Sequence, residues 1–142
     1  MKLAIITDQH FGARKGADYI HGYFKKFYDD IFFPYLEKNK IDTVVDMGDT
    51  FDNRRNIDLA TLEWAKKNYY DRLQAMGITV HTIVGNHTAY YKDTNEINTV
   101  ELLLKEYDNV EVYAEPTTIN LGGLDILLLP WINEENKMKT LE

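Results

Sequence analysis

The chain has 142 residues and a formal net charge of −7, and 44% of its residues are hydrophobic. That length suits one domain with a sizeable core, and the composition is typical of a globular protein. The sequence contains no cysteine, which excludes disulfides, zinc–thiolate sites and thiol catalysis. The acidic balance argues against holding nucleic acid by bulk attraction, but bound cations can reverse the local field.

The apolar segments are too short for a membrane-spanning helix. The longest run, residues 126–132, falls well below the roughly 20 residues that such a helix needs. The N-terminal sequence reaches Asp8 too early to form the apolar core of a signal peptide. We therefore expect a cytoplasmic protein without a membrane segment.

The first half of the chain predicts a strand, a helix and a second strand. Residues 3–6 are continuously apolar, which is typical of a strand covered on both faces. Residues 18–39 have helical periodicity, and we expect Pro34 to bend or end that helix. Residues 42–47 are rich in β-branched side chains and predict the second strand. We interpret one stripe of the helix as core: Tyr19, Tyr23, Phe27, Ile31 and Tyr35.

The second half continues the alternation of helices and strands. Residues 57–76 predict a helix that ends at Gly77, residues 78–84 a strand, and residues 99–107 a short helix. Strands are then expected at residues 110–113, 117–121 and 124–129, the last two joined at Gly122 and Gly123 in a tight hairpin. This order predicts an α/β fold with a largely parallel sheet in one domain, residues 1–142. The apolar face of the second helix comprises Leu59, Leu62, Ala65, Tyr69, Leu73 and Met76.

Three short polar clusters follow the first three predicted strands. The carboxyl ends of strands in an α/β sheet surround a common crevice, so these clusters should converge. Their side chains offer carboxylate, amide and imidazole groups, which together describe a binuclear metal site. The clusters are Asp8-Gln9-His10, Gly48-Asp49 and Gly85-Asn86-His87.

The residue types indicate how such a site would be built. Asp8 and His10 can reach one ion from the same turn, Asp49 can bridge two ions, and Asn86 can hold the second through its amide oxygen. These ligands favour Mn²⁺, with Mg²⁺, Fe²⁺ or Zn²⁺ as alternatives. Two cations roughly 3.5–4 Å apart stabilise an in-line displacement at phosphorus. His87 could then protonate the leaving oxygen, which predicts metal-assisted phosphoester hydrolysis.

Each cluster alone could be an ordinary polar turn, and only their joint occurrence makes the site specific. We interpret His21 and His81 as packed or surface histidines rather than ligands. Arg54 and Arg55 fit equally well as contacts to a substrate phosphate or as solvated loop residues.

The motifs Asp8-x-His10, Gly48-Asp49-Thr50-Phe51-Asp52 and Gly85-Asn86-His87 resemble the first three motifs of the calcineurin-like metallophosphoesterases. Within that superfamily the chain most resembles the SbcD-type DNA repair nucleases, including the recombination endonuclease subunits of T-even-type phages.

The resemblance implies a four-layer α/β/β/α sandwich with two Mn²⁺ ions. Asp8 and His10 would hold the first ion, Asp49 would bridge, Asn86 would hold the second, and His87 would be the catalytic histidine. Family members act as exonucleases and endonucleases on DNA ends in recombination and repair. They work as homodimers with an ABC-type ATPase of the SbcC kind.

The chain departs from the family pattern in two respects. It has no histidine after His87, so it lacks the later Gly-His-x-His motif and is expected to be the N-terminal part of such a domain. Thr88 stands where the family usually has aspartate, which predicts a less basic His87. Two other functions remain open: a phosphatase of the same superfamily, and an inactive scaffold with this fold.

Overall fold

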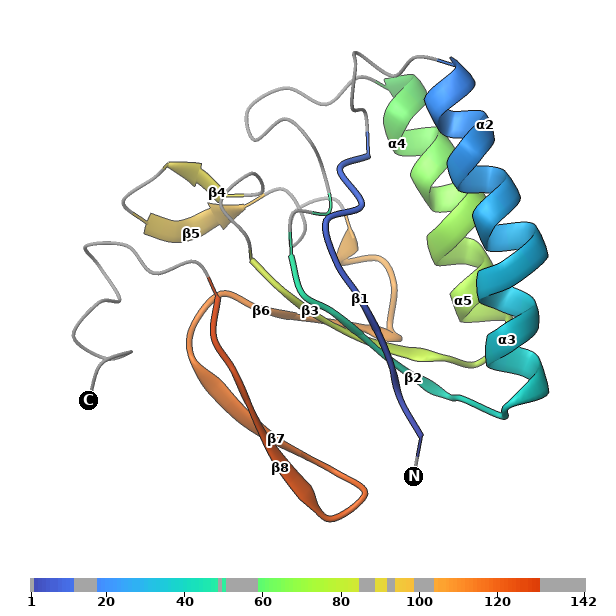
Figure 1. Ribbon diagram of the computed structural model, residues 1–142. Coiled ribbons are helices and arrows are strands. Elements are labelled where there is room, and N and C mark those ends of the chain that lie inside the picture. The colour runs from blue at the N-terminus through green and yellow to red at the C-terminus, as the bar shows by residue number, and fades with distance from the viewer. Residues whose placement is uncertain are drawn as a thin grey trace.

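The computed structural model describes residues 2–11, 18–48, 50, 59–84, 89–91, 94–98 and 104–130. Four of its strands form a parallel sheet in the order β1–β2–β3–β6, as Figure 1 shows. The predicted α/β class and the largely parallel sheet are therefore confirmed. The strands are β1 (Ala4–Ile6), β2 (Thr43–Asp46), β3 (Thr79–Ile83) and β6 (Val110–Tyr113).

Two helical rods cover one face of this sheet (Figure 1). Each rod consists of two α-helical segments with a π-helical turn between them. The first rod contains α2 (Asp18–Phe27), η1 (Tyr28–Phe32) and α3 (Phe33–Lys38). The second contains α4 (Leu59–Ala65), η2 (Lys66–Tyr70) and α5 (Asp71–Ala75). In the described part of the chain, no helix is long and apolar enough to cross a membrane.

The first rod does not end at Pro34, contrary to one outcome that the sequence suggests. Helix α3 begins at Phe33 and continues to Lys38, and Pro34 lies in its first turn. The π-helical turn lies directly before it, and the Phe33 N–H donates to the Tyr28 carbonyl oxygen. The rod continues through Pro34, because Phe32 and Phe33 before it keep right-handed helical backbone angles.

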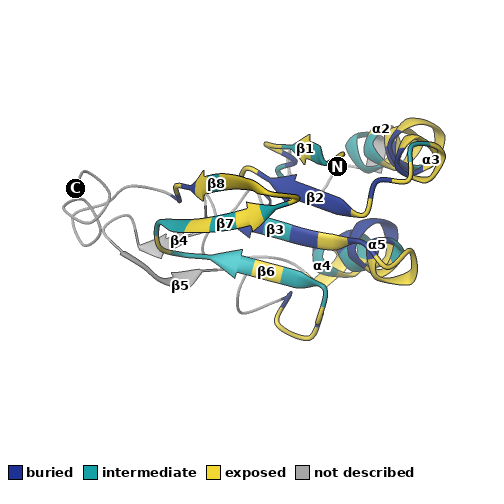
Figure 2. Ribbon diagram, turned by 90° about the horizontal axis from the view of Figure 1, so that it is seen from below, coloured by how far each residue is buried: buried dark blue, intermediate teal, exposed yellow. Residues whose placement is uncertain are grey.

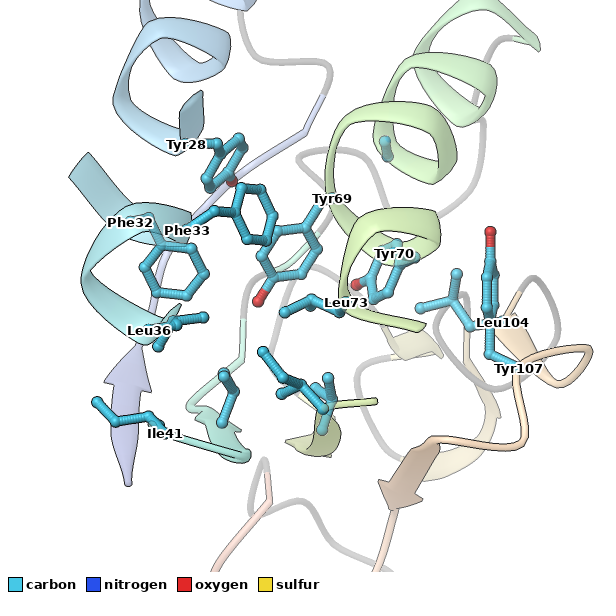
Figure 3. Close-up of a cluster of buried hydrophobic side chains, with 14 of the residues drawn as sticks. Tyr28, Phe32, Phe33, Leu36, Ile41, Tyr69, Tyr70, Leu73, Leu104 and Tyr107 are labelled. Atoms are coloured by element: carbon cyan, nitrogen blue, oxygen red, sulfur yellow. The ribbon is translucent and has the colours of Figure 1, made fainter. Parts of the chain in front are cut away.

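The main core lies between the two rods and the sheet and is rich in aromatic rings (Figure 3). Tyr28 and Tyr69 are both fully buried, with ring centroids 5.2 Å apart. Val44 and Val80 are the fully buried residues that the sheet contributes to this core, and Figure 2 shows β2 buried along its length. Aromatic pairs of this kind add to the stabilisation that burial itself provides.

The interpretation of the first helix's aromatic stripe as core is wrong, apart from Tyr19, whose side chain lies outside the described part of the chain. Tyr23, Ile31 and Tyr35 are 72%, 59% and 60% exposed, and Phe27 is also exposed. The buried face of this rod instead contains Tyr28, Phe32, Phe33 and Leu36. The rod is apolar on both sides, so periodicity alone could not show which side meets the sheet.

The strands β7 (Thr117–Leu121) and β8 (Leu124–Leu128) form the predicted antiparallel hairpin. Gly122 and Gly123 have φ values of 60° and 88°, as a two-residue turn with positive φ at both positions requires. The hairpin packs on the other face of the sheet in a smaller core that includes Val45, Ile83 and Leu128.

The hairpin does not cover the edge strand β1. Ile5 is 66% exposed, so the expectation that residues 3–6 are covered on both faces is wrong at this position. An antiparallel pair that the sequence did not predict, β4 (Ala89–Tyr91) and β5 (Thr94–Asn98), follows β3. Most of the short helix expected at residues 99–107 falls outside the described residues.

Candidate metal centre

The carboxyl ends of β1, β2 and β3 lie side by side. Ile6 is in register with Asp46, and Asp46 is in register with Thr82. The loops after β1 and β2 also touch, because the Asp8 N–H donates to the Gly48 carbonyl oxygen at 3.1 Å. The three loops that carry the polar clusters therefore begin at the same edge of the parallel sheet, as the sequence predicts.

Asp8 and His10 are the predicted ligands that the structure describes. The His10 Nε2 atom lies 3.5 Å from Asp8 Oδ1, and the Thr7 hydroxyl donates to Asp8 Oδ2 at 2.8 Å. Asp8 is exposed and His10 is partly buried, so this edge of the sheet is accessible to solvent. A carboxylate and an imidazole so close together are a suitable donor pair for a divalent cation.

The backbone at these two residues adopts an uncommon conformation. Asp8 and His10 have φ values of 55° and 46°, in the left-handed region that non-glycine residues rarely occupy. Gly48, in the neighbouring loop, has a φ of 108°. Such conformations persist where surrounding contacts enforce them, and they are concentrated at functional sites.

A fully buried carboxylate lies next to these loops at the end of β2. Asp46 accepts hydrogen bonds from Gln9 Nε2 at 2.8 Å and from the Gly48 N–H at 3.2 Å, with a weaker contact from the Thr50 hydroxyl at 3.5 Å. Burial raises the pKa of Asp46 to about 7, although these donors oppose the shift. The buried network therefore places an ionisable group beside the candidate site.

The sequence predicts no role for Asp46, Thr50, Tyr28 or Gln9. All four are buried, and the Tyr28 hydroxyl donates to Gln9 Oε1. One signal was present, because Asp46 interrupts an otherwise apolar and β-branched strand. A carboxylate in that position must find donors.

The other predicted site residues, Asp49, Asn86, His87, Arg54 and Arg55, lie outside the described residues. Their roles stay predictions. Among the residues that the structure does describe, no three His, Cys, Asp or Glu side chains are grouped closely enough to hold a metal ion.

His21 and His81 are packed, as the sequence interpretation expected. The His21 ring stacks on Trp64 with centroids 4.5 Å apart. His81 Nδ1 lies 2.8 Å from the Tyr113 hydroxyl, and burial lowers the pKa of His81.

Comparison with known proteins gives three findings. The sequence pattern of the family described as calcineurin-like phosphoesterase matches residues 1–135. Exonuclease subunit 1 of Enterobacteria phage T4 is 40% identical over 144 aligned positions, which cover 100% of this chain and 41% of the phage protein. A nuclease of Pseudomonas putida, named MPE, has a similar crystal structure with a TM-score of 0.52.

The structural match has 19% sequence identity and covers 82% of this chain and 50% of the P. putida nuclease. At that identity it shows the fold alone. The chain spans about two fifths of the length of the phage relative and overlaps half of the bacterial nuclease.

Proposed function

The chain belongs to the calcineurin-like phosphoesterase family, and we propose that it forms the metal-binding part of a nuclease that hydrolyses phosphodiester bonds in DNA. The observation that carries this proposal is the meeting of two loops at the carboxyl edge of the sheet. The Asp8 backbone N–H donates a hydrogen bond to the Gly48 carbonyl oxygen, and Asp8 Oδ1 lies 3.5 Å from His10 Nε2. The 40% identity to a phage exonuclease subunit favours DNA as the substrate.

The family implies divalent metal ions. We propose two Mn²⁺, with Mg²⁺ as the alternative, because carboxylate, amide and imidazole ligands suit these ions. Asp8 and His10 would hold the first ion, Asp49 would bridge, and Asn86 would hold the second. Bound divalent cations supply Lewis-acid activation of the phosphodiester.

The remaining residues act on the substrate. His87 would give a proton to the leaving alkoxide as the P–O bond breaks. Arg54 and Arg55 would contact phosphate oxygens next to the scissile bond, where guanidinium groups bind in a bidentate manner. Thr88 follows His87 without a charge, so it can orient the imidazole by hydrogen bonding but cannot polarise it as aspartate would.

A second protein would supply part of the DNA-binding surface. The net charge of −7 is unfavourable for contact with phosphates, so the chain alone offers little bulk attraction. The phage relative is named as a subunit, which supports a multi-subunit complex. We propose a homodimer associated with an SbcC-like ABC-type ATPase, acting in DNA end processing, recombination and repair in the cytoplasm.

Substrate choice tests this function. The chain is incubated with end-labelled DNA, bis(p-nitrophenyl) phosphate and p-nitrophenyl phosphate, each with Mn²⁺, Mg²⁺ or EDTA. A nuclease cleaves the DNA and the diester in Mn²⁺ and loses both activities in EDTA. Hydrolysis of the monoester alone would instead identify a phosphatase, and Mn²⁺ binding without hydrolysis of any ester would favour the scaffold.

A further inference from the structure

We propose that the buried hydrogen-bond chain Tyr28–Gln9–Asp46 is a positioning device that fixes the ligand loops after β1 and β2 relative to each other. This inference rests on the proposed metal site. It adds three residues that touch neither metal nor substrate and act through Asp8, His10 and Asp49.

Gln9 connects the first loop to two other elements. Its side chain lies between the two predicted ligands in sequence, and only 2% of the residue is exposed. Nε2 donates to Asp46 Oδ2 at 2.8 Å, and Oε1 accepts from the Tyr28 hydroxyl. One amide group thus ties the loop after β1 to the end of β2 and to the π-helical turn η1.

Asp46 fixes the second loop in the same way. One of its oxygens accepts from the Gly48 N–H at 3.2 Å, and the other lies 3.5 Å from the Thr50 hydroxyl. Gly48 and Thr50 flank Asp49, so the Asp46 carboxylate contacts both chain neighbours of the predicted bridging ligand. A backbone hydrogen bond also joins the two loops directly, because the Phe11 N–H donates to the Thr50 carbonyl oxygen at 2.8 Å.

The backbone of the first loop explains why such a device is needed. Asp8 and His10, with φ of 55° and 46°, lie in a region that non-glycine residues leave unless their surroundings hold them there. Gln9, between them, is buried, and both the nitrogen and the oxygen of its side-chain amide form hydrogen bonds. Loosening its bonds should let both ligands move away from the geometry that a cation requires.

A pair of tyrosine variants tests the device. Tyr28→Phe removes the hydroxyl that holds Gln9. The matched control Tyr107→Phe removes another hydroxyl, partly buried, which donates to Asp71 Oδ1 in α5 at 2.6 Å. Figure 3 shows Tyr28 and Tyr107 at opposite ends of the core. Mn²⁺ affinity is measured from the EPR signal of free Mn²⁺, and the melting temperature of the metal-free protein is recorded alongside.

We expect Tyr28→Phe to weaken Mn²⁺ binding by about threefold to tenfold, which is less than the roughly 10–100-fold loss for a direct hydrogen-bond partner of a ligand, because Tyr28 acts through Gln9. The control should weaken binding by less than about twofold. Both variants should lower the melting temperature. Equal Mn²⁺ affinities in the two variants would overturn the positioning role. A wild-type chain that binds no Mn²⁺ would overturn the proposed function and this inference with it.

A side-chain exchange provides the second test. Gln9→Glu brings a carboxylate against Asp46, and we expect Mn²⁺ affinity to fall by about tenfold or more. Adding Asp46→Asn supplies an amide donor that faces the new carboxylate at position 9. The Mn²⁺ affinity of the double variant should therefore recover to within about threefold of wild type. A double variant as weak as Gln9→Glu would contradict the proposal.

Discussion

Asp46 combines full burial with three hydrogen-bond donors, and this makes its protonation sensitive to folding. Burial raises the pKa of the native carboxyl to about 7, whereas an unfolded aspartate has a pKa of about 3.9. Between these pH values the unfolded chain releases the proton and the native protein keeps it. Because the unfolded state then binds fewer protons, a rise in pH lowers the stability of the native state.

We therefore predict that the contribution of Asp46 to the stability of the metal-free protein falls as pH rises from about 4 to about 7. One such group contributes a slope of at most about 1.4 kcal/mol per pH unit. Asp46→Asn removes this contribution, so its stability should depend less on pH in that window. Urea unfolding in the presence of a chelator at several pH values measures both slopes, and identical slopes would show that Asp46 is ionised in the native protein.

The second residue-level prediction concerns Thr88. If the uncharged Thr88 leaves His87 less basic than an aspartate would, Thr88→Asp should raise the turnover of end-labelled DNA, whose leaving group is an alkoxide, by about tenfold. His87→Asn is the matched variant and should abolish that turnover while Mn²⁺ still binds. An unchanged turnover in Thr88→Asp would show that this position does not tune His87.

Among the helical elements, Leu73 and Leu59 make a useful pair. Both belong to the apolar face predicted for one helix, but Leu73 is fully buried and Leu59 is 82% exposed. Leu73→Ala should lower the free energy of unfolding by about 2–5 kcal/mol, because it leaves a cavity in the core. Leu59→Ala should change it by less than about 0.5 kcal/mol. Urea unfolding compares the two, and equal losses would contradict the packing described.

The same comparison shows what the sequence could and could not predict about the helices. Periodicity located both rods but not their buried faces. The rods contain π-helical turns, which shift the side chains that follow and bring Asn68, Tyr69 and Tyr70 into the interior as consecutive buried residues. A pattern based on regular α-helical spacing cannot anticipate that shift. In the first rod, which is apolar on both sides, periodicity assigned Tyr23 and Tyr35 to the core in place of Tyr28 and Phe33.

At the scale of the whole molecule, the parallel sheet was the feature that the sequence predicted best. Alternating strands and helices implied it, and it brings the starts of the loops after β1, β2 and β3 to one edge. The supporting network could not be predicted in this way. Gln9 lies 19 residues from Tyr28 and 37 from Asp46, and only folding brings them together. No local pattern encodes such a contact.

The proposed function requires a metal site at the carboxyl edge of the sheet. We would titrate the chain with Mn²⁺ by calorimetry and compare it with Asp49→Asn. The control is Asp42→Asn, which changes an exposed carboxylate immediately before β2, at the other end of that strand. We expect one or two ions to bind to the wild type and to the control, and binding to be lost in Asp49→Asn. Equal binding by all three proteins, or none by the wild type, would contradict the account.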